Sequence, residues 1–461
     1  MNTKNKRSIL AALVWIAMIP LCTTNALAAS QAQINTAIDS GLANLSSQQT
    51  VSGYWNYGGY EQAATGAAAY AMLSQKIRWG TNTATYQAKV TNGINWLLSQ
   101  ATTTTVSTRN DGINICPGGI GSCTAIYWYG AGETTYTTGL VAPAIAFYAS
   151  ANPSAVATNS GPLAGMTWTQ IAQGITNMFA AGQSTANNGN RQGGWRYFPG
   201  DGDSDMSTTQ WAVISLTYDQ VLGAVTPAIV KSDLAIWLVA VQYINTNLSD
   251  PNHVLNGVAC YQPGAQPCEN ADTGGLLLSL NFIGKSASDP AVQAAFSFLN
   301  NNWPTYENSI WYGNFGQPYA MWAQYKALET NIGLNNTTTI TNLLDPTCGG
   351  NSPTTCNWWQ DYNQWLVQNQ NADGSWTGYY YWTGVLATSF NLPILGGSQI
   401  PTNVCDMNHD GVITTADISI ISSMLRRVVT QGSSGDWNFD GHITTQDTRG
   451  CTLQITPVTP G

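Results

Sequence analysis

Two segments near the C-terminal end of the sequence carry oxygen-bearing residues at the spacing that binds a cation. Residues 406–417 and 436–447 start thirty positions apart, and both place aspartate or asparagine at positions 1, 3 and 5, glycine at 6 and aspartate at 12. Carboxylate and carbonyl oxygens are hard ligands that suit Ca²⁺, and glycine permits the sharp turn around the ion. The sequence therefore predicts two calcium ions. Their ligands would be Asp406, Asn408, Asp410, Val412, Thr414 and Asp417 in the first loop, and Asp436, Asn438, Asp440, His442, Thr444 and Asp447 in the second, with Val412 and His442 using backbone carbonyls.

Both loops have the EF-hand pattern, and the features around them resemble a type I dockerin. The loops are duplicated, aspartate replaces glutamate at position 12, and an apolar helix is predicted over 418–429 between them. The resemblance implies that residues 405–461 form a calcium-binding module that folds with its ions and attaches to a cohesin-type domain. Only a short stretch separates the second loop from Cys451, so we expect a short second helix.

A second set of candidates consists of carboxylates that stand at the start of predicted apolar helices. Each of them can simply stabilise a helix N-terminus, an effect of about 0.3–1 kcal/mol for an exposed group. Together they would surround one end of a helical array and supply a general acid and a general base for glycoside chemistry, with Trp and Tyr rings as sugar platforms. We predict catalytic roles for Asp205 and Glu133, and substrate-binding roles for Glu61, Asp203 and Asp272.

Apolar periodicity predicts six pairs of helices that would position these acids. The first helix of each pair is amphipathic, and the second is almost wholly apolar and follows a Gly/Asn-rich turn. The amphipathic outer helices are expected at 31–48, 87–100, 166–182, 228–247, 289–300 and 357–369. The apolar inner helices are expected at 62–75, 135–150, 207–221, 273–283, 317–328 and 383–395.

The turn of the last pair spaces Gln370, Gly374 and Trp376 as Gln-x3-Gly-x-Trp, and tryptophans recur at other turns. Glutamine can bond to backbone at a helix end, glycine permits a tight turn, and tryptophan can cover the joint between hairpins. This pattern resembles the QW repeat of the squalene-cyclase and prenyltransferase-like superfamily. The resemblance implies that residues 30–395 form a six-hairpin (α/α)6 toroid whose inner helices line a central cavity. The expected protein is therefore all-α, with a linker at 396–404 before the small duplicated EF-hand-like module.

The same superfamily suggests another use of the acids. Residues 203–208 resemble the Asp-x-Asp-Asp-Thr segment of class II terpene cyclases, which implies a proton-donating role for Asp205, although Met206 replaces the last aspartate. Zinc-dependent prenyl transfer is not expected, because His253 is the only histidine before residue 396. The open alternatives are therefore a glycan-directed or polymer-directed toroid, a terpene-cyclase-like enzyme, and a non-catalytic structural module of a surface assembly.

The N-terminus and the overall charge limit the partners. Residues 1–29 combine Lys4, Lys6 and Arg7 with an apolar run and Ala26-Leu27-Ala28, the layout of a secretory signal peptide. Removing these three cations changes the formal charge from −9 to −12, which disfavours nucleic acid. No other stretch is apolar and long enough to span a membrane. Only 8% of residues are charged, while Trp, Tyr, Asn, Gln, Thr and Ser are abundant. This composition fits a secreted protein with a neutral glycan or polymer as its partner, and it fits an extracellular protein with a neutral polar surface about as well.

Eight cysteines remain after the predicted signal peptide, and they fall into four near pairs. An even number of cysteines in a secreted chain favours structural disulfides over metal or redox chemistry. The expected pairs are Cys116 with Cys123, Cys260 with Cys268, Cys348 with Cys356, and Cys405 with Cys451. The last pair would clasp the two ends of the calcium-binding module.

Overall fold

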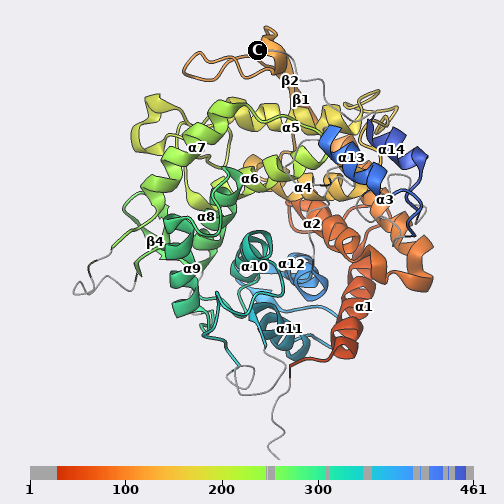
Figure 1. The fold of residues 1–461 in the computed structure, drawn as a ribbon, viewed down its shortest axis with the longest axis vertical. Coiled ribbons are helices and arrows are strands. Elements are labelled where there is room, and N and C mark those ends of the chain that lie inside the picture. The colour runs from red at the N-terminus through yellow and green to blue at the C-terminus, as the bar shows by residue number, and fades with distance from the viewer. Residues whose placement is uncertain are drawn as a thin grey trace, which may run out of the picture.

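A computed structural model of the protein describes residues 28–245, 247, 255–307, 312–345, 356–397, 405, 407, 415–428, 435 and 442–452. Helices account for most of this part of the chain, so the expectation of a predominantly helical protein is confirmed (Figure 1). Within the described ranges, none of the helices has both the length and the apolar character that a membrane span requires.

The twelve helices predicted between residues 31 and 395 are all present. The outer helices are α1 (Gln31–Gln48), α3 (Thr83–Gln100), α5 (Trp168–Gly182), α7 (Ala228–Val241), α9 (Pro290–Asn302) and α11 (Trp358–Gln368). The inner helices are α2 (Glu61–Ser74), α4 (Thr134–Ala149), α6 (Met206–Val221), α8 (Asn270–Phe282), α10 (Pro318–Ile332) and α12 (Gly384–Gly396). The prediction that α7 continues to residue 247 was wrong, because Gln242 adopts an extended backbone and pairs with Ala259.

The inner helices contact one another in a closed cycle. The helix α2 packs on α4, α4 on α6, α6 on α8, α8 on α10, α10 on α12, and α12 again on α2 (Figure 1). Glycine allows this close approach: a Cβ at Gly66 would lie 2.6 Å from the carbonyl oxygen of Leu140, and one at Gly139 would lie 2.7 Å from Cβ of Trp211. The outer helices cover this cycle, with α3 on α2, α5 on α6, α7 and α9 on α8, and α1 and α11 on α12.

A glutamine, a glycine and a tryptophan join the last hairpin to the first. The Gln370 amide donates to the carbonyl oxygens of Gly374, 2.9 Å away, and of Ala37 in α1, 2.8 Å away. Gly374 has a φ of +85°, and a Cβ there would collide with the Ser40 carbonyl. The Trp376 indole N–H donates to the carbonyl of Leu366 in α11, 3.0 Å away. The predicted roles of these three residues are confirmed.

The same joint recurs at other hairpins. In each case a glutamine directly after an outer helix donates to a carbonyl in its own turn and to a carbonyl of the following outer helix. The second acceptors are Lys89 for Gln49, Val230 for Gln183, and Ala291 for Gln242. Tryptophans at the turns bond to the outer helix that precedes them, Trp55 to Leu45, Trp128 to Leu97 and Trp195 to Phe179. The backbone N–H groups of these tryptophans donate to the hydroxyls of Thr65, Thr138 and Thr209 at the start of the inner helices.

Short strands and short 3-10 segments occupy the connections, and none of them was predicted from the sequence. Three antiparallel pairs form in the described residues, β1 (Thr102–Val106) with β2 (Cys123–Tyr127), β3 (Ala259–Gln262) with β4 (Ala265–Glu269), and β5 (Gly378–Tyr379) with β6 (Trp382–Thr383). The 3-10 segments are η1 (Lys76–Arg78), η2 (Gly80–Asn82), η3 (Pro117–Gly119) and η4 (Ala186–Arg191). The β-branched run 102–106 favours a strand, but it is too short to be separated from a loop by its pattern.

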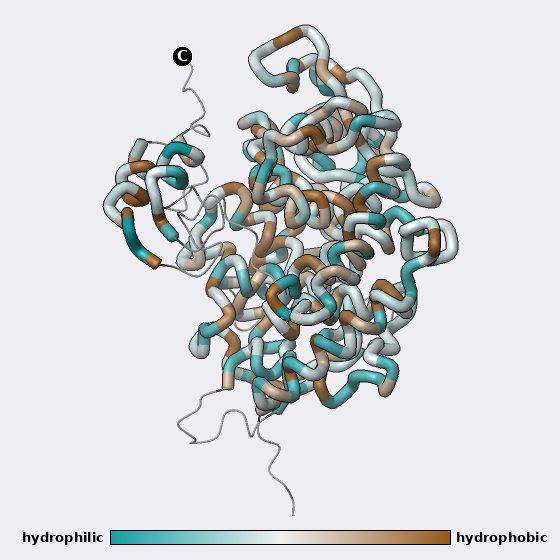
Figure 2. The backbone as a smooth tube through the Cα atoms, turned by 90° about the vertical axis from the view of Figure 1, so that its right-hand side faces the viewer, coloured by the Kyte–Doolittle hydropathy of each residue, from teal (hydrophilic) through white to brown (hydrophobic). Residues whose placement is uncertain are grey.

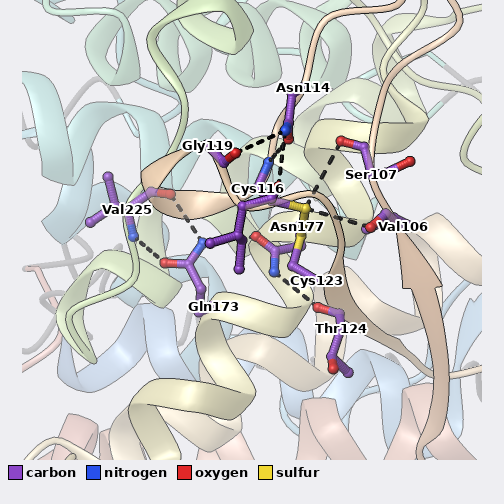
Figure 3. The surroundings of a disulfide bond; sticks show 11 residues. Val106, Ser107, Asn114, Cys116, Gly119, Cys123, Thr124, Gln173, Asn177 and Val225 are labelled. Atoms are coloured by element: carbon purple, nitrogen blue, oxygen red, sulfur yellow. Dashed lines mark hydrogen bonds between the residues drawn. A yellow bond between two sulfur atoms is a disulfide. The ribbon is translucent and has the colours of Figure 1, made fainter.

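Disulfides brace two of these strand pairs. Cys116 is bonded to Cys123 at the start of β2, and Cys260 in β3 is bonded to Cys268 in β4. Near the first bridge, Asn114 accepts a hydrogen bond from the Cys116 N–H, 2.9 Å away (Figure 3). Cys356 is also disulfide-bonded, and its predicted partner Cys348 lies outside the described residues. Disulfides of this kind persist in oxidising compartments.

The described C-terminal residues form a small lobe with its own core (Figure 2). Its helices are α13 (Thr415–Ser423) and α14 (Thr445–Thr452), which begin thirty residues apart, as the duplicated loops predict. The bonded pair Cys405–Cys451 packs with Ile421 and Ile443 in this core. The predicted helix 418–429 was wrong in its bounds. The helix ends earlier because the chain turns through Arg426, which has a φ of +73° and donates its N–H to the Ile443 carbonyl.

The joint between α11 and α1 yields a first prediction. Replacing Gln370 with methionine keeps the length of the side chain and removes the amide donor. We expect Gln370→Met to lower the free energy of unfolding by about 1–3 kcal/mol, because the carbonyls of Ala37 and Gly374 lose a partner at a half-buried site. Urea unfolding of the whole protein measures this change.

The control is Gln368→Met, an exposed position in the last turn of the same helix. This variant should stay within about 0.5 kcal/mol of the wild type. Equal losses for the two variants would contradict the joining role of Gln370.

Candidate functional site

The first turns of several inner helices meet on one side of the helical cycle. Tyr136 in the first turn of α4 stacks on Tyr197, which precedes α6, and on Trp382, which precedes α12, with ring centroids 6.0 and 6.2 Å apart. The Tyr136 hydroxyl lies 3.4 Å from the hydroxyl of Tyr319 in the first turn of α10. The predicted gathering of inner-helix N-termini is therefore present for these helices.

Asp205 is buried at the N-terminus of α6 and is held by several donors. Its carboxylate accepts the Thr208 N–H at 2.7 Å and the Ser207 hydroxyl at 2.6 Å, and it forms an ion pair with Arg196 at 2.5 Å. Burial raises the pKa of Asp205, while these hydrogen bonds and the guanidinium act in the opposite direction. Asp205 is thus both the cap of α6 and the partner of a cation.

Asp203 lies on the more exposed side of the same loop. Its carboxylate is 3.1 Å from the Arg191 guanidinium and 3.5 Å from that of Arg196. Arg196 also donates to the hydroxyl of Tyr261 in β3, 2.7 Å away, and that hydroxyl lies 3.2 Å from the Tyr197 hydroxyl. Both arginines are therefore neutralised locally, and neither is left to attract an anionic substrate.

Asp272 and Glu269 form a second buried acidic pair at the start of α8. Glu269 caps this helix by accepting the N–H groups of Ala271 and Asp272 at 2.8 and 3.2 Å. Burial raises the pKa of Glu269 to about 8, although these two bonds lower it. Burial also raises the pKa of Asp272 well above its usual range, and the nearby charges of Glu269 and Asp205 add to this rise. Asp272 is therefore favoured in its neutral form.

Three buried polar atoms border the ring of Tyr319. Trp382 stacks on Tyr319 with ring centroids 4.7 Å apart, and the Gln210 amide donates to the Tyr319 hydroxyl. The Trp382 indole nitrogen, Gln210 Oε1 and Asp272 Oδ1 have no hydrogen-bond partner among the described residues. Buried polar groups are normally paired with protein or with other molecules. These atoms are therefore suited to bind the hydroxyl groups of a ligand.

Glu133 and Glu61 lie nearer the surface. Glu133 precedes α4 but does not cap it, and burial raises the pKa of its carboxyl. Besides burial, its negative charge contributes to the raised pKa values of Tyr60 and Tyr197, so its carboxyl lies near these two rings. Glu61 in the first turn of α2 accepts the Gly59 N–H at 3.0 Å. No contact between Glu61 and the Asp205 or Asp272 carboxyls is seen in the described residues.

Aromatic side chains fill the middle of the inner-helix cycle. Trp211 of α6 stacks on Trp322 of α10 and on Phe390 of α12, with centroids 5.2 and 6.0 Å apart, and all three side chains are buried. The expectation of an open central cavity is not met here, because these rings meet one another across the cycle. Asp205 and Asp272 are themselves buried at the N-termini of α6 and α8.

A surface cleft of about 320 Å³ lies beside this cluster rather than within it. It runs between the β1–β2 hairpin, α5 and the loop at 198–200. Thr134 of α4 forms part of its wall, only two residues from Tyr136. The residues that line the cleft are Thr104, Val106, Ala125, Tyr127, Tyr129, Thr134, Met178, Ala181, Gly182, Phe198, Pro199 and Gly200.

Four of the predicted calcium ligands lie in the described residues. Asp417 and Asp447 are fully buried in the first turns of α13 and α14. Asp417 accepts the Met407 N–H at 2.8 Å, and Asp447 accepts both the N–H and the hydroxyl of Thr444 at 2.7 and 2.8 Å. His442 pairs through its backbone with Val428. The other predicted ligands, Asp406, Asn408, Asp410, Val412, Thr414, Asp436, Asn438 and Asp440, lie outside the described residues.

The acidic and aromatic cluster comprises Asp203, Asp205, Glu269, Asp272, Arg196, Tyr136, Tyr197, Tyr261, Tyr319 and Trp382. Several of these residues were not predicted from the sequence. Glu269 precedes a predicted inner helix just as the chosen acids do, and the same rule would have found it. Arg196 and Tyr261 carry no such signal, since they meet Asp205 only because the loop before α6 and strand β3 lie side by side.

The buried acids predict how stability depends on pH. A carboxyl whose pKa is raised by folding favours the protonated form, so its contribution is complete below the unfolded pKa of about 4 and is lost as pH rises. We expect the free energy of unfolding of the wild type to fall between about pH 4 and 8. Asp272→Asn should reduce this fall, because the amide cannot ionise. Urea unfolding across this pH range measures the slope.

The control is Asp289→Asn at the start of α9. A hydrogen bond from Lys285 lowers the pKa of Asp289, so its contribution is lost as pH falls through the acidic range. This variant should therefore keep the wild-type slope between about pH 5 and 8. If Asp272→Asn kept that slope as well, the burial of an uncharged Asp272 would be contradicted.

Comparison with models of known protein families gave no match, and comparison with curated proteins gave none either. The roles of the cluster must therefore be inferred from its own chemistry. That chemistry consists of one carboxylate paired with a guanidinium, two buried carboxyls with raised pKa values, and a group of tyrosine and tryptophan rings.

Proposed function

We propose that this protein is secreted and that its helical domain binds or processes a neutral glycan or another neutral polymer, while its calcium-binding C-terminal module attaches it to a cohesin-type scaffold. The observation that carries the first part is the acidic and aromatic cluster. Its polar atoms border aromatic rings, a combination that suits sugars because ring faces cover C–H groups and polar atoms bind hydroxyls.

The electrostatics of the cluster favour a neutral ligand. Arg191 and Arg196 are paired with Asp203 and Asp205, so an anionic group would find no unpaired cation there. The further carboxyls at Glu133, Glu269 and Asp272 have raised pKa values and offer an anion no compensating positive charge. A neutral, hydroxyl-rich molecule needs none.

The two buried aspartates differ in the way that acid–base chemistry requires. Burial raises the pKa of both, but at Asp205 two hydrogen bonds and a guanidinium stabilise the ionised form, whereas Asp272 has no cation partner among the described residues and favours its proton. A neutral carboxyl can act as a general acid and an ionised one as a base or an electrostatic stabiliser. We therefore assign the acid role to Asp272 and the ionised role to Asp205. Both side chains are almost wholly buried, so turnover requires Trp382 or its neighbours to move aside.

The closed contact cycle of the inner helices and the repeated glutamine joints support a six-hairpin (α/α)6 toroid for residues 30–395. The calcium-binding module is supported by the matching positions of Asp417 and Asp447, which are both buried in the first turn of their helix. Carboxylates at the last position of each loop are the ligands that the pattern requires. Asp447 also accepts two hydrogen bonds from Thr444, another predicted ligand of the same loop.

The aromatic interior favours a second candidate, a terpene-cyclase-like enzyme. Rings such as Trp211, Trp322 and Phe390 can stabilise carbocations. Proton donation from Asp205 would then start the reaction. The ion pair with Arg196 disfavours this role, because a guanidinium stabilises the aspartate anion.

The test of the helical domain is binding and turnover on neutral polysaccharides. We expect the wild type to bind such a polymer and to bind its uronic-acid counterpart at least about tenfold more weakly, a difference of about 1.4 kcal/mol. If the domain is an enzyme, Asp272→Asn and Asp205→Asn should each lower turnover by at least about a hundredfold. Glu133→Gln tests the remaining predicted catalytic residue.

The outcomes separate the candidates. Binding without turnover would identify a binding domain, and a cyclised product from a polyprenyl substrate would favour the terpene-cyclase-like enzyme. A wild type that neither binds nor converts either class would leave a structural role in a surface assembly.

The test of the C-terminal module is calcium titration of the whole protein by calorimetry. We expect two sites, and we expect Asp406→Ala combined with Asp436→Ala to abolish both, because each removes the first ligand of its loop. Asp373→Ala, an exposed acid in the turn after α11, is the control and should leave the titration unchanged. A wild type that binds no calcium would refute the module.

A further inference from the structure

The cleft beside β1 and β2 adjoins the acidic and aromatic cluster, since Thr134 and Phe198 line the cleft and their neighbours Tyr136 and Tyr197 belong to the cluster. Thr135 joins the two sides, since its N–H donates to the Tyr197 carbonyl at 3.0 Å and its hydroxyl to the Arg196 carbonyl at 2.6 Å. Two successive residues of the same loop contribute to different sites. Tyr197 stacks on Tyr136 in the cluster, whereas Phe198 lines the cleft.

Two exposed aromatic rings form one end of this cleft. Tyr129 is 55% exposed and Phe198 is 37% exposed, and their ring centroids lie 6.1 Å apart with the planes inclined by 36°. Large exposed apolar rings that face a cleft are typical of binding sites. The rings of Tyr129 and Phe198 form two adjoining exposed surfaces on which a ligand can stack, and they do not enclose an apolar pocket.

The rest of the cleft is uncharged and carries hydroxyl groups. Its lining contains no Asp, Glu, Lys or Arg, and Thr104, Thr134 and Tyr127 contribute hydroxyl-bearing side chains. An acidic or basic peptide would find no charge partner in this lining. The combination of exposed rings and neutral hydroxyls suits a neutral sugar chain better than an apolar peptide.

The cleft walls are held in place independently of any ligand. The Cys116–Cys123 disulfide braces β2, and the Asn177 side chain in α5 donates to the Thr124 carbonyl at 2.9 Å (Figure 3). Gly182 of α5 lets Pro199 approach closely, since a Cβ there would collide with the proline ring. A preformed site loses less conformational entropy on binding.

We infer that this cleft is a second subsite for the same ligand, and that the ligand is a neutral polysaccharide chain several sugar units long rather than a single sugar. One part of the chain occupies the region of Tyr197 and Trp382, and the adjoining part stacks on Tyr129 and Phe198. This inference rests on the proposed function of the helical domain. It adds that recognition depends on the length of the chain.

The test uses cello-, xylo- and manno-oligosaccharides of about two to six units, titrated into the whole protein. For the series that binds, we expect the wild-type affinity to rise with length. The double variant Tyr129→Ala with Phe198→Ala should bind the longest member about tenfold more weakly, a factor within the range that two lost stacking contacts span. Binding of the two-unit member should change by less than about twofold.

The control variant is Tyr306→Ala, which removes an exposed aromatic ring away from the cleft and should keep the wild-type dependence on length. Thermal unfolding of each variant establishes that the fold is retained. A folded double variant that kept the full dependence on length would overturn the second subsite while leaving the proposed function intact. A wild type that bound none of the oligosaccharides would instead refute the proposed function, and the subsite with it.

Discussion

The structure depends on one repeated hydrogen-bonding arrangement, a glutamine that joins a hairpin to the next outer helix at four of the six hairpins. Gln49, Gln183 and Gln242 tie hairpins along the chain, and Gln370 ties the last of them back to α1. In each joint a buried or half-buried side-chain amide donates to backbone carbonyls of two segments, so the joint holds an outer helix against the preceding turn. This is what gathers the first turns of the inner helices on one side.

That gathering creates the chemistry of the site. A carboxylate at one helix start is an ordinary cap, as Asp205 and Glu269 are. Once several starts meet, burial and mutual repulsion raise the pKa of Asp272, while Arg196 compensates the charge of Asp205. Burial raises the pKa of both aspartates, but hydrogen bonds and a guanidinium oppose this rise at Asp205, whereas neighbouring acids add to it at Asp272.

The helical part and the C-terminal lobe are stabilised by different interactions. The helical part relies on a large aromatic core and on backbone-directed joints. Among the described residues of the C-terminal lobe, Ile421 and Ile443 pack with the Cys405–Cys451 disulfide to form its core. Small cores are commonly stabilised by disulfides or metal ions, and this disulfide is one such constraint.

The sequence by itself determined the local elements, because helix periodicity and the Gln-Gly-Trp turn are properties of neighbouring residues. It therefore predicted the twelve helices, the pairings of Cys116, Cys260 and Cys405, and the acids at helix starts. It did not determine that α7 ends at Val241, that Arg196 meets Asp205, or that Trp211 and Trp322 fill the centre. Those features result from contacts between segments that are far apart in the chain. Burial and charge pairing depend on which segments become neighbours, so these features could be seen only in the folded structure.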